Sequence, residues 1–187
     1  DPLSLDPSTL HSDAEVSLRD SGHTLLVGAK ESVTYLEVSG LAAKPVVSFL
    51  RGFSAPVKVT HPRDPEELAF LVRHDTDGFV RWDAMQTLWM QHFDTDIQAS
   101  VNPVAVLGSL AEDALRRETA EDQLLAATML SVPNENYLFE QLRGFQVDAL
   151  LDARDAAVSK AGLAHAEIWA QLVDKHEAKQ AYQADAQ

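Results

Sequence analysis

The chain has 187 residues, a formal net charge of −14, 45% hydrophobic residues and no cysteine. Nucleic acids and anionic membranes attract basic surfaces, so this acidic composition argues against both as partners. The lack of cysteine excludes disulfides, thiolate metal sites and cysteine nucleophiles, and it is compatible with a reducing compartment such as the cytoplasm.

Residues 1–61 show the signals of short β-strands. Five segments predict strands: 14–19, 23–28, 32–38, 45–50 and 55–59. The first two are separated by Asp20-Ser21-Gly22, which indicates a hairpin turn. Pro45 and Pro56 belong at strand starts or edges, because proline lacks the N–H that a ladder needs. Residues 1–61 are therefore predicted to be the C-terminal part of a small, Ig-like β-sandwich.

From residue 62 onward the signals are helical. Asp64-Pro65-Glu66-Glu67 combines an N-cap, a proline at the first helical position and a glutamate of a capping box. Further helix starts are predicted at Asp75 or Asp77, Asn102, Thr119 and Asn134, and residues 146–175 form one long helix or two that meet near Gly162. The predicted fold class is α+β by segments. A partial antiparallel β-sandwich (1–61) is followed by an all-α, HEAT/ARM-like superhelical array (62–187).

Candidate metal sites fail on spacing. A helix-borne zinc site needs two histidines four residues apart with a glutamate beside the first. The one His-Glu pair is His176-Glu177, and Gln180 stands where the second histidine is needed. Asp75-Thr76-Asp77-Gly78 suggests a calcium loop, but Phe79 and Gln86 occupy ligand positions, so an Asp-capped turn between helices is favoured. We therefore assign no catalytic, cofactor-binding or metal-ligating residue.

Other polar and aromatic groups favour structural roles. His92 with Asp94 and Asp96 could form a carboxylate–imidazole cluster, but a histidine at a helix C-terminus is the favoured interpretation. Arg81 and Asp83 flank Trp82, which indicates an Arg–Asp ladder that ties adjacent helices together around the Trp82 ring. The aromatic residues of this region are predicted to lie in the core: Phe79, Trp82, Trp89 and Phe93.

Three segments carry a resemblance to a known family. They are Phe49-Leu50-Arg51-Gly52-Phe53-Ser54-Ala55-Pro56-Val57-Lys58, residues 68–88 with Phe79-Val80-Arg81-Trp82-Asp83-Ala84, and Leu130-Ser131-Val132-Pro133-Asn134-Glu135. Together they resemble the M1-family zinc aminopeptidases of the bacterial aminopeptidase N type. The matching region is the end of the Ig-like sandwich and the start of the C-terminal helical domain.

The resemblance implies that the chain is a fragment of a longer enzyme that releases N-terminal residues from peptides. In that family the zinc lies in a thermolysin-like domain, and the helical domain curves over the active site and limits entry. The fragment would be a non-catalytic scaffold and lid without a cofactor of its own. Its partners would be the rest of the parent chain and the parent's peptide substrates, in the cytoplasm.

Two alternatives remain open. The chain could be a stand-alone helical-repeat interaction module whose acidic surface binds a basic or peptide partner. It could also be an unrelated hydrolase, since the members of a Ser/His/Asp triad can lie far apart in sequence. A His-Glu-x-x-His motif upstream in the parent reading frame would decide for the peptidase. Asp1 and the late first methionine, Met85, lead us to expect a chain cut from something longer.

Overall fold

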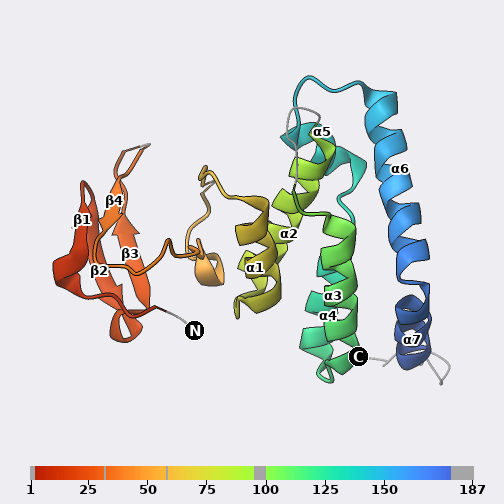
Figure 1. Cartoon of the computed structure of the whole chain (residues 1–187), viewed down its shortest axis with the longest axis horizontal. Coiled ribbons are helices and arrows are strands. Elements are labelled where there is room, and N and C mark those ends of the chain that lie inside the picture. Colours follow the sequence, from red (N-terminus) through yellow and green to blue (C-terminus); the bar gives the residue numbers. More distant parts are fainter. Residues whose placement is uncertain (1–2, 32, 58, 95–99, 178–187) are drawn as a thin grey trace, which may run out of the picture. The chain divides into compact units, whose positions relative to one another are not determined.

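The structure, a computed structural model, describes residues 3–31, 33–57, 59–94 and 100–177 (Figure 1). It divides between Val46 and Val47 into two compact units. The predicted change from strand to helix at residues 61 and 62 lies inside the second unit. Residues 47–64 belong to that unit because they bond to its first helices, as in the ion pair of Arg63 with Asp83.

The first unit contains short antiparallel strands. They are β1 (Leu10–Ser12), β2 (Glu15–Arg19), β3 (Thr24–Gly28) and β4 (Leu36–Val38). β2 and β3 form the predicted hairpin, in which Glu15 pairs with Gly28, and β1 pairs with β4 in a second two-stranded sheet. The hairpin turn is a 3-10 helix (Asp20–Gly22) in which Asp20, Ser21 and Gly22 all have positive φ. Along β2 the half-buried residues alternate with exposed ones, as the sequence pattern predicted.

The described residues of the second unit form a 3-10 helix, η3 (Arg51–Phe53), followed by seven α-helices. These are α1 (Pro65–His74), α2 (Gly78–Phe93), α3 (Pro103–Arg116), α4 (Ala120–Met129), α5 (Glu135–Gln141), α6 (Val147–Ala164) and α7 (Ala166–His176). The structure therefore has a few short antiparallel strands followed by helices, and the predicted fold class is confirmed. Of the two capping residues predicted for α2, Asp75 and Asp77, the structure uses Asp77. The long C-terminal segment is two helices, which meet at His165.

Local capping explains where the helices start. The side-chain oxygens of Asp77, Asn102, Thr119 and Asn134 each accept a hydrogen bond from a backbone N–H two or three residues further on, at 2.9–3.1 Å. At α1 the Glu67 carboxylate also accepts from the Asp64 N–H at 3.4 Å, as in a capping box. These bonds satisfy N–H groups that the first helical turn leaves unpaired.

The core of the second unit is built from apolar side chains of α1, α2 and α3. Leu68, Val72, Met85, Trp89 and Val106 have exposed fractions of 0%. Helix α1 packs along α2, and α3 packs against α4, α6 and α7. Burying such side chains supplies about 1.5–3 kcal/mol each relative to leaving them in water. None of the described helices has the length and hydrophobicity to cross a membrane.

Two of the predicted strands are wrong. Residues 45–50 and 55–57 run as irregular backbone on either side of η3, and Lys58 lies outside the described residues. A strand exists only where a neighbouring strand accepts and donates its ladder bonds. Here Pro45 and Pro56 offer no N–H, and the chain between them bonds to the turn between α1 and α2 through Arg51 and Gly52.

Candidate functional site

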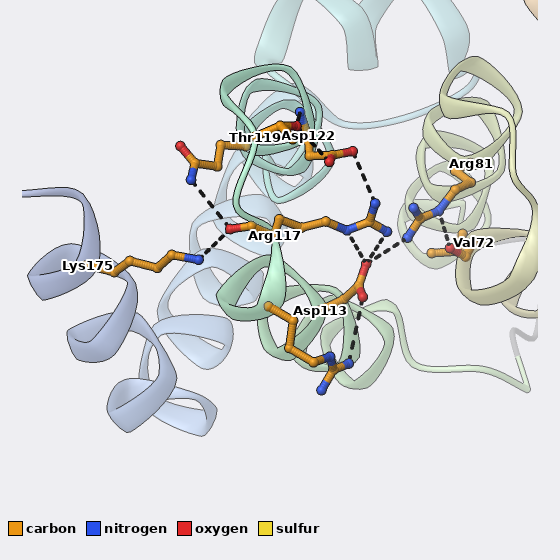
Figure 2. A network of polar contacts seen from close by, with 9 residues as sticks. Val72, Arg81, Asp113, Arg117, Thr119, Asp122 and Lys175 are labelled. Atoms are coloured by element: carbon orange, nitrogen blue, oxygen red, sulfur yellow. Dashed lines mark hydrogen bonds and ion pairs between the residues drawn. The ribbon is translucent and has the colours of Figure 1, made fainter.

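An ionic junction centred on Asp113 connects the helices of the second unit (Figure 2). Asp113 Oδ2 accepts hydrogen bonds from Arg117 Nη2 at 2.7 Å and from Arg117 Nε at 3.1 Å, and it lies 3.5 Å from Arg81 Nη2. Arg116 Nη2 approaches the other carboxylate oxygen at 3.7 Å. One carboxylate of α3 therefore holds a guanidinium group of α2 and two from the C-terminal end of its own helix.

Arg81 extends the junction to α1. Its Nε donates a hydrogen bond to the Val72 carbonyl at 2.9 Å. Val72 belongs to the last turn of α1, where carbonyls have no partner within the helix. Arg81 is only 8% exposed, so its guanidinium group depends on these two acceptors in place of water.

Arg117 extends the junction to α4. Its Nη1 donates to Asp122 Oδ1 at 3.2 Å, and the same carboxylate accepts from the Thr119 hydroxyl at 2.7 Å. The Gln123 amide nitrogen donates to the carbonyls of Arg117 and Glu118 at 3.4 and 3.2 Å. The first turn of α4 is thereby fixed to the end of α3.

Lys175 of α7 caps the C-terminal end of α3. Its Nζ donates to the carbonyls of Arg117 at 2.5 Å and Leu115 at 2.7 Å, and lies 3.5 Å from that of Ala114. A cation at this position satisfies unpaired carbonyls and opposes the negative end of the helix dipole. Helix α7 is therefore held to α3 by a polar contact as well as by packing.

Burial and charge act in opposite directions at the central ion pair. Burial alone would raise the pKa of Asp113, but hydrogen bonds and charges from Arg117 and Arg81 together outweigh it, so this pKa lies below its ordinary value. The hydrogen bond to Asp113 raises the pKa of Arg117, which is charged at any physiological pH. Both groups are therefore ionised, and the junction is a charged network at neutral pH.

The junction offers no room for a substrate. The cavity beside Arg81, Asp113, Arg117 and Asp122 has a volume of about 10 Å³, which is the space of one water molecule. Across residues 3–31, 33–57, 59–94 and 100–177, no group of three or more His, Cys, Asp or Glu is arranged to hold a metal ion. The residues described therefore do not fit a zinc site, and the junction's chemistry is that of a structural tie.

Residues 65–187 match the family described as "Domain of unknown function (DUF3458_C) ARM repeats". The match begins at the first residue of α1 and includes every α-helix of the structure. The chain belongs to the DUF3458_C family. The predicted ARM-like helical array agrees with this description, and the ionic junction lies wholly within the DUF3458_C region.

The DUF3458_C chain is also similar to bacterial aminopeptidases. It is 35% identical over 141 residues to aminopeptidase N of Caulobacter vibrioides, which covers 74% of this chain and 16% of the relative. It is 30% identical over 118 residues to aminopeptidase N of Escherichia coli, and this match covers 60% of this chain and 13% of that relative. The predicted resemblance to aminopeptidase N is confirmed, and the chain spans about a sixth of the length of these relatives or less.

A solved structure supports the fold. Legionella pneumophila aminopeptidase A, crystallised in complex with aspartic acid, superposes with a TM-score of 0.65 at 17% sequence identity. The alignment covers 97% of this chain and 24% of the Legionella chain. At this identity the comparison establishes a shared fold for both the strand segment and the DUF3458_C helices.

The predicted Arg–Asp ladder is found in part, because Arg81 ties α2 to α3 whereas the partner of Asp83 precedes α1 and Trp82 is only half-buried. Arg81 bonds to Asp113, while the Asp83 carboxylate pairs with Arg63 Nη2 at 3.1 Å. The core prediction holds for Trp89 and Phe93, which are buried and whose rings stack at 5.7 Å. It holds less well for Phe79 and Trp82, which are half-buried.

The other sequence candidates lie apart from the junction. Asp77 caps α2, as the Asp-capped turn requires, and Asp75 accepts from the Asp77 N–H at 2.8 Å. His92 lies in the last turn of α2, where burial and the charge of Lys160 lower its pKa. His176 ends α7. Two residues named with these histidines lie outside the described residues: Asp96 and Gln180.

Sequence reasoning did not single out Asp113, Arg117 or Lys175. The spacing of Asp113 and Arg117 is that of a favourable pair one helical turn apart, and this signal was available. The partners contributed by α1, α2 and α7 could not be read from the sequence, because they depend on how the helices pack.

Proposed function

We propose that this chain is a non-catalytic scaffold and lid segment of a zinc-dependent, M1-family aminopeptidase that removes N-terminal residues from peptides. The observation that carries the proposal is the similarity to aminopeptidase N, which covers 74% of this chain but 16% of the relative. The similarity thus spans a minor part of aminopeptidase N, and the polar network in the matching helices bonds them to one another, which supports a scaffold role.

The zinc and the residues that bind it belong, in this proposal, to the remainder of the longer protein. The partners of the segment are that remainder and the peptide substrates whose entry the helices limit. A cytoplasmic location is part of the same proposal, and a chain without cysteine is compatible with a reducing compartment.

A chimaera tests the proposal. The matching 141-residue region of Caulobacter aminopeptidase N is replaced by this chain's aligned residues, and hydrolysis of an aminoacyl chromogenic substrate is measured with zinc. We expect the chimaera to hydrolyse the substrate and a Caulobacter aminopeptidase N variant without the 141-residue region to be inactive. The isolated chain with added zinc should hydrolyse no more substrate than a sample without protein. A soluble, folded chimaera without activity, or hydrolysis by the isolated chain, would contradict the proposal.

A further inference from the structure

Four aromatic side chains form a continuous row on the second unit. The ring centroids of Phe53 and Phe79 are 5.2 Å apart, those of Phe79 and Trp82 are 6.2 Å apart, and those of Trp82 and Tyr137 are 6.4 Å apart. The row runs from η3 across α2 to α5. Phe53 is 59% exposed and the other three are half-buried, so this aromatic row is accessible along its length.

The backbone that carries Phe53 is strained. Leu50 and Phe53 have φ values of 54° and 51°, in the left-handed region that costs a non-glycine residue about 1–3 kcal/mol. Contacts with the α1–α2 turn hold the strained segment in place. Arg51 donates to Asp75 at 2.6 Å and to Thr76 at 2.8 Å.

The Gly52 N–H completes these contacts by donating to Asp77 Oδ2 at 2.6 Å. Strained backbone segments cluster at binding sites. This segment is fixed by several polar bonds and places the large apolar ring of Phe53 in solvent. Core packing does not account for it, because the Phe53 ring remains mostly in water.

Two carboxylates lie beside the aromatic row, since Asp83 follows Trp82 in α2 and Glu140 comes about one turn after Tyr137 in α5. Burial is the main cause of the raised pKa of Tyr137, and the charges of Asp83 and Glu140 raise it further. Within the part of the chain that the structure describes, no ion pair engages Glu140, which is exposed. Arg51 and Arg63 are paired with Asp75 and Asp83. Arg143 keeps its charge, and it donates to the backbone carbonyls of Glu140 and Leu142.

We propose that the aromatic row is a docking surface for a polypeptide segment in which Arg or Lys side chains alternate with aliphatic ones. Aromatic faces attract cations, and guanidinium groups stack well on tryptophan and tyrosine. Aliphatic side chains would cover the exposed Phe53 ring, while the Glu140 carboxylate would pair with a cation at the far end. This binding goes beyond the scaffold role and does not depend on it.

Fluorine NMR on the full chain labelled with fluorotryptophan tests the proposal, because the three tryptophans report on different places. Trp82 lies in the aromatic row, Trp89 is 0% exposed, and Trp169 lies in α7. The probe is the acetylated, amidated peptide Leu-Arg-Leu-Arg-Leu, and the matched control is Leu-Glu-Leu-Glu-Leu. We expect the arginine peptide to shift the Trp82 signal, with the shift saturating at a peptide concentration of about 1 mM. The glutamate peptide should leave the Trp82 signal unchanged.

Two exposed substitutions and one control identify the surface. Phe53→Ala and Glu140→Gln should each weaken binding of the arginine peptide by about threefold or more. Phe70→Ala removes a ring that is 49% exposed on α1 but outside the aromatic row, and it should leave binding unchanged. An unmoved Trp82 signal, equal binding of both peptides or unaltered binding by Phe53→Ala would overturn the proposal. So would a Trp82 shift that follows protein concentration without peptide, because a second copy would then be the occupant.

Discussion

Arg81 is a nearly buried cation, and the stability of the folded chain depends on the Asp113 carboxylate that balances its charge. Asp113→Asn keeps the shape of the side chain but removes the charge that balances Arg81 and Arg117. Because Asp113 is itself partly exposed, we expect a loss of about 1–2 kcal/mol in the free energy of unfolding rather than the full cost of a buried unpaired charge. Urea unfolding followed by circular dichroism measures this loss.

The matched control for that substitution is Asp155→Asn. Asp155 also pairs with an arginine, Arg154, at 3.2 Å, but its side chain is 78% exposed. A surface pair of this kind contributes about 0–1 kcal/mol, so the control should unfold much like the unmodified chain. Equal effects of the two substitutions would show that the junction adds no more than a surface ion pair.

The same carboxylate predicts how stability depends on pH. The pKa of Asp113 is lowered in the folded chain, so the unfolded state takes up a proton first as the pH falls. The stabilisation from Asp113 is therefore fully present above the unfolded pKa of about 3.9 and is lost as the pH drops through the folded value. The difference in unfolding free energy between the unmodified chain and Asp113→Asn should be constant from about pH 6 to 7 and shrink toward about pH 3. A difference that grows in acid would contradict this assignment.

At the scale of elements, the point where α6 meets α7 packs against α3 through a contact between His165 and Gly108. His165 Nε2 lies 2.9 Å from the Val104 carbonyl oxygen, to which it donates. A Cβ built on Gly108 would lie 2.6 Å from that same nitrogen, so Gly108→Ala must displace the imidazole ring. We expect it to lower the melting temperature, although alanine favours a helix over glycine by about 0.5–1 kcal/mol.

Gly162→Ala is the control, because Gly162 lies within α6 and a Cβ there would meet no atom within 4 Å. This substitution should raise the melting temperature through helix propensity alone. The two variants make the same chemical change in helices, so opposite shifts would isolate the contact with His165. A stabilising Gly108→Ala would show that the imidazole ring yields without cost.

The elements that could be predicted from sequence are those whose signals are local. Asp64-Pro65, Asn102-Pro103 and Asn134 each place a capping group where a helix starts, and the structure begins a helix directly after each capping residue. The segments 45–50 and 55–59 have the right residues for strands, but none of their described residues pairs with another strand. Bonds of the Asp113 junction join residues up to 61 positions apart, as between Lys175 and Ala114, and only the Asp113–Arg117 pair one turn apart leaves a local trace in the sequence.

At the scale of the whole molecule, the two units differ in how they bury side chains. Among the described residues of 1–46, Gly22 alone is buried, and the strands form two sheets of two strands each. Two-stranded sheets without a packed core are marginal in water. In contrast, every apolar side chain that is fully buried among the described residues lies in the unit 47–187, from Leu68 onward.

This difference predicts that the two units depend unequally on one another for stability. A polypeptide of residues 47–187 should keep its helical circular dichroism signal and unfold cooperatively, because the buried apolar side chains of the described residues lie in this unit. A polypeptide of residues 1–46 should show no cooperative transition, because two small sheets do not bury enough apolar surface to offset the loss of chain entropy. Thermal unfolding of both polypeptides beside the full chain measures this. Loss of cooperative unfolding in residues 47–187 would mean that the helical core needs the strand unit to form.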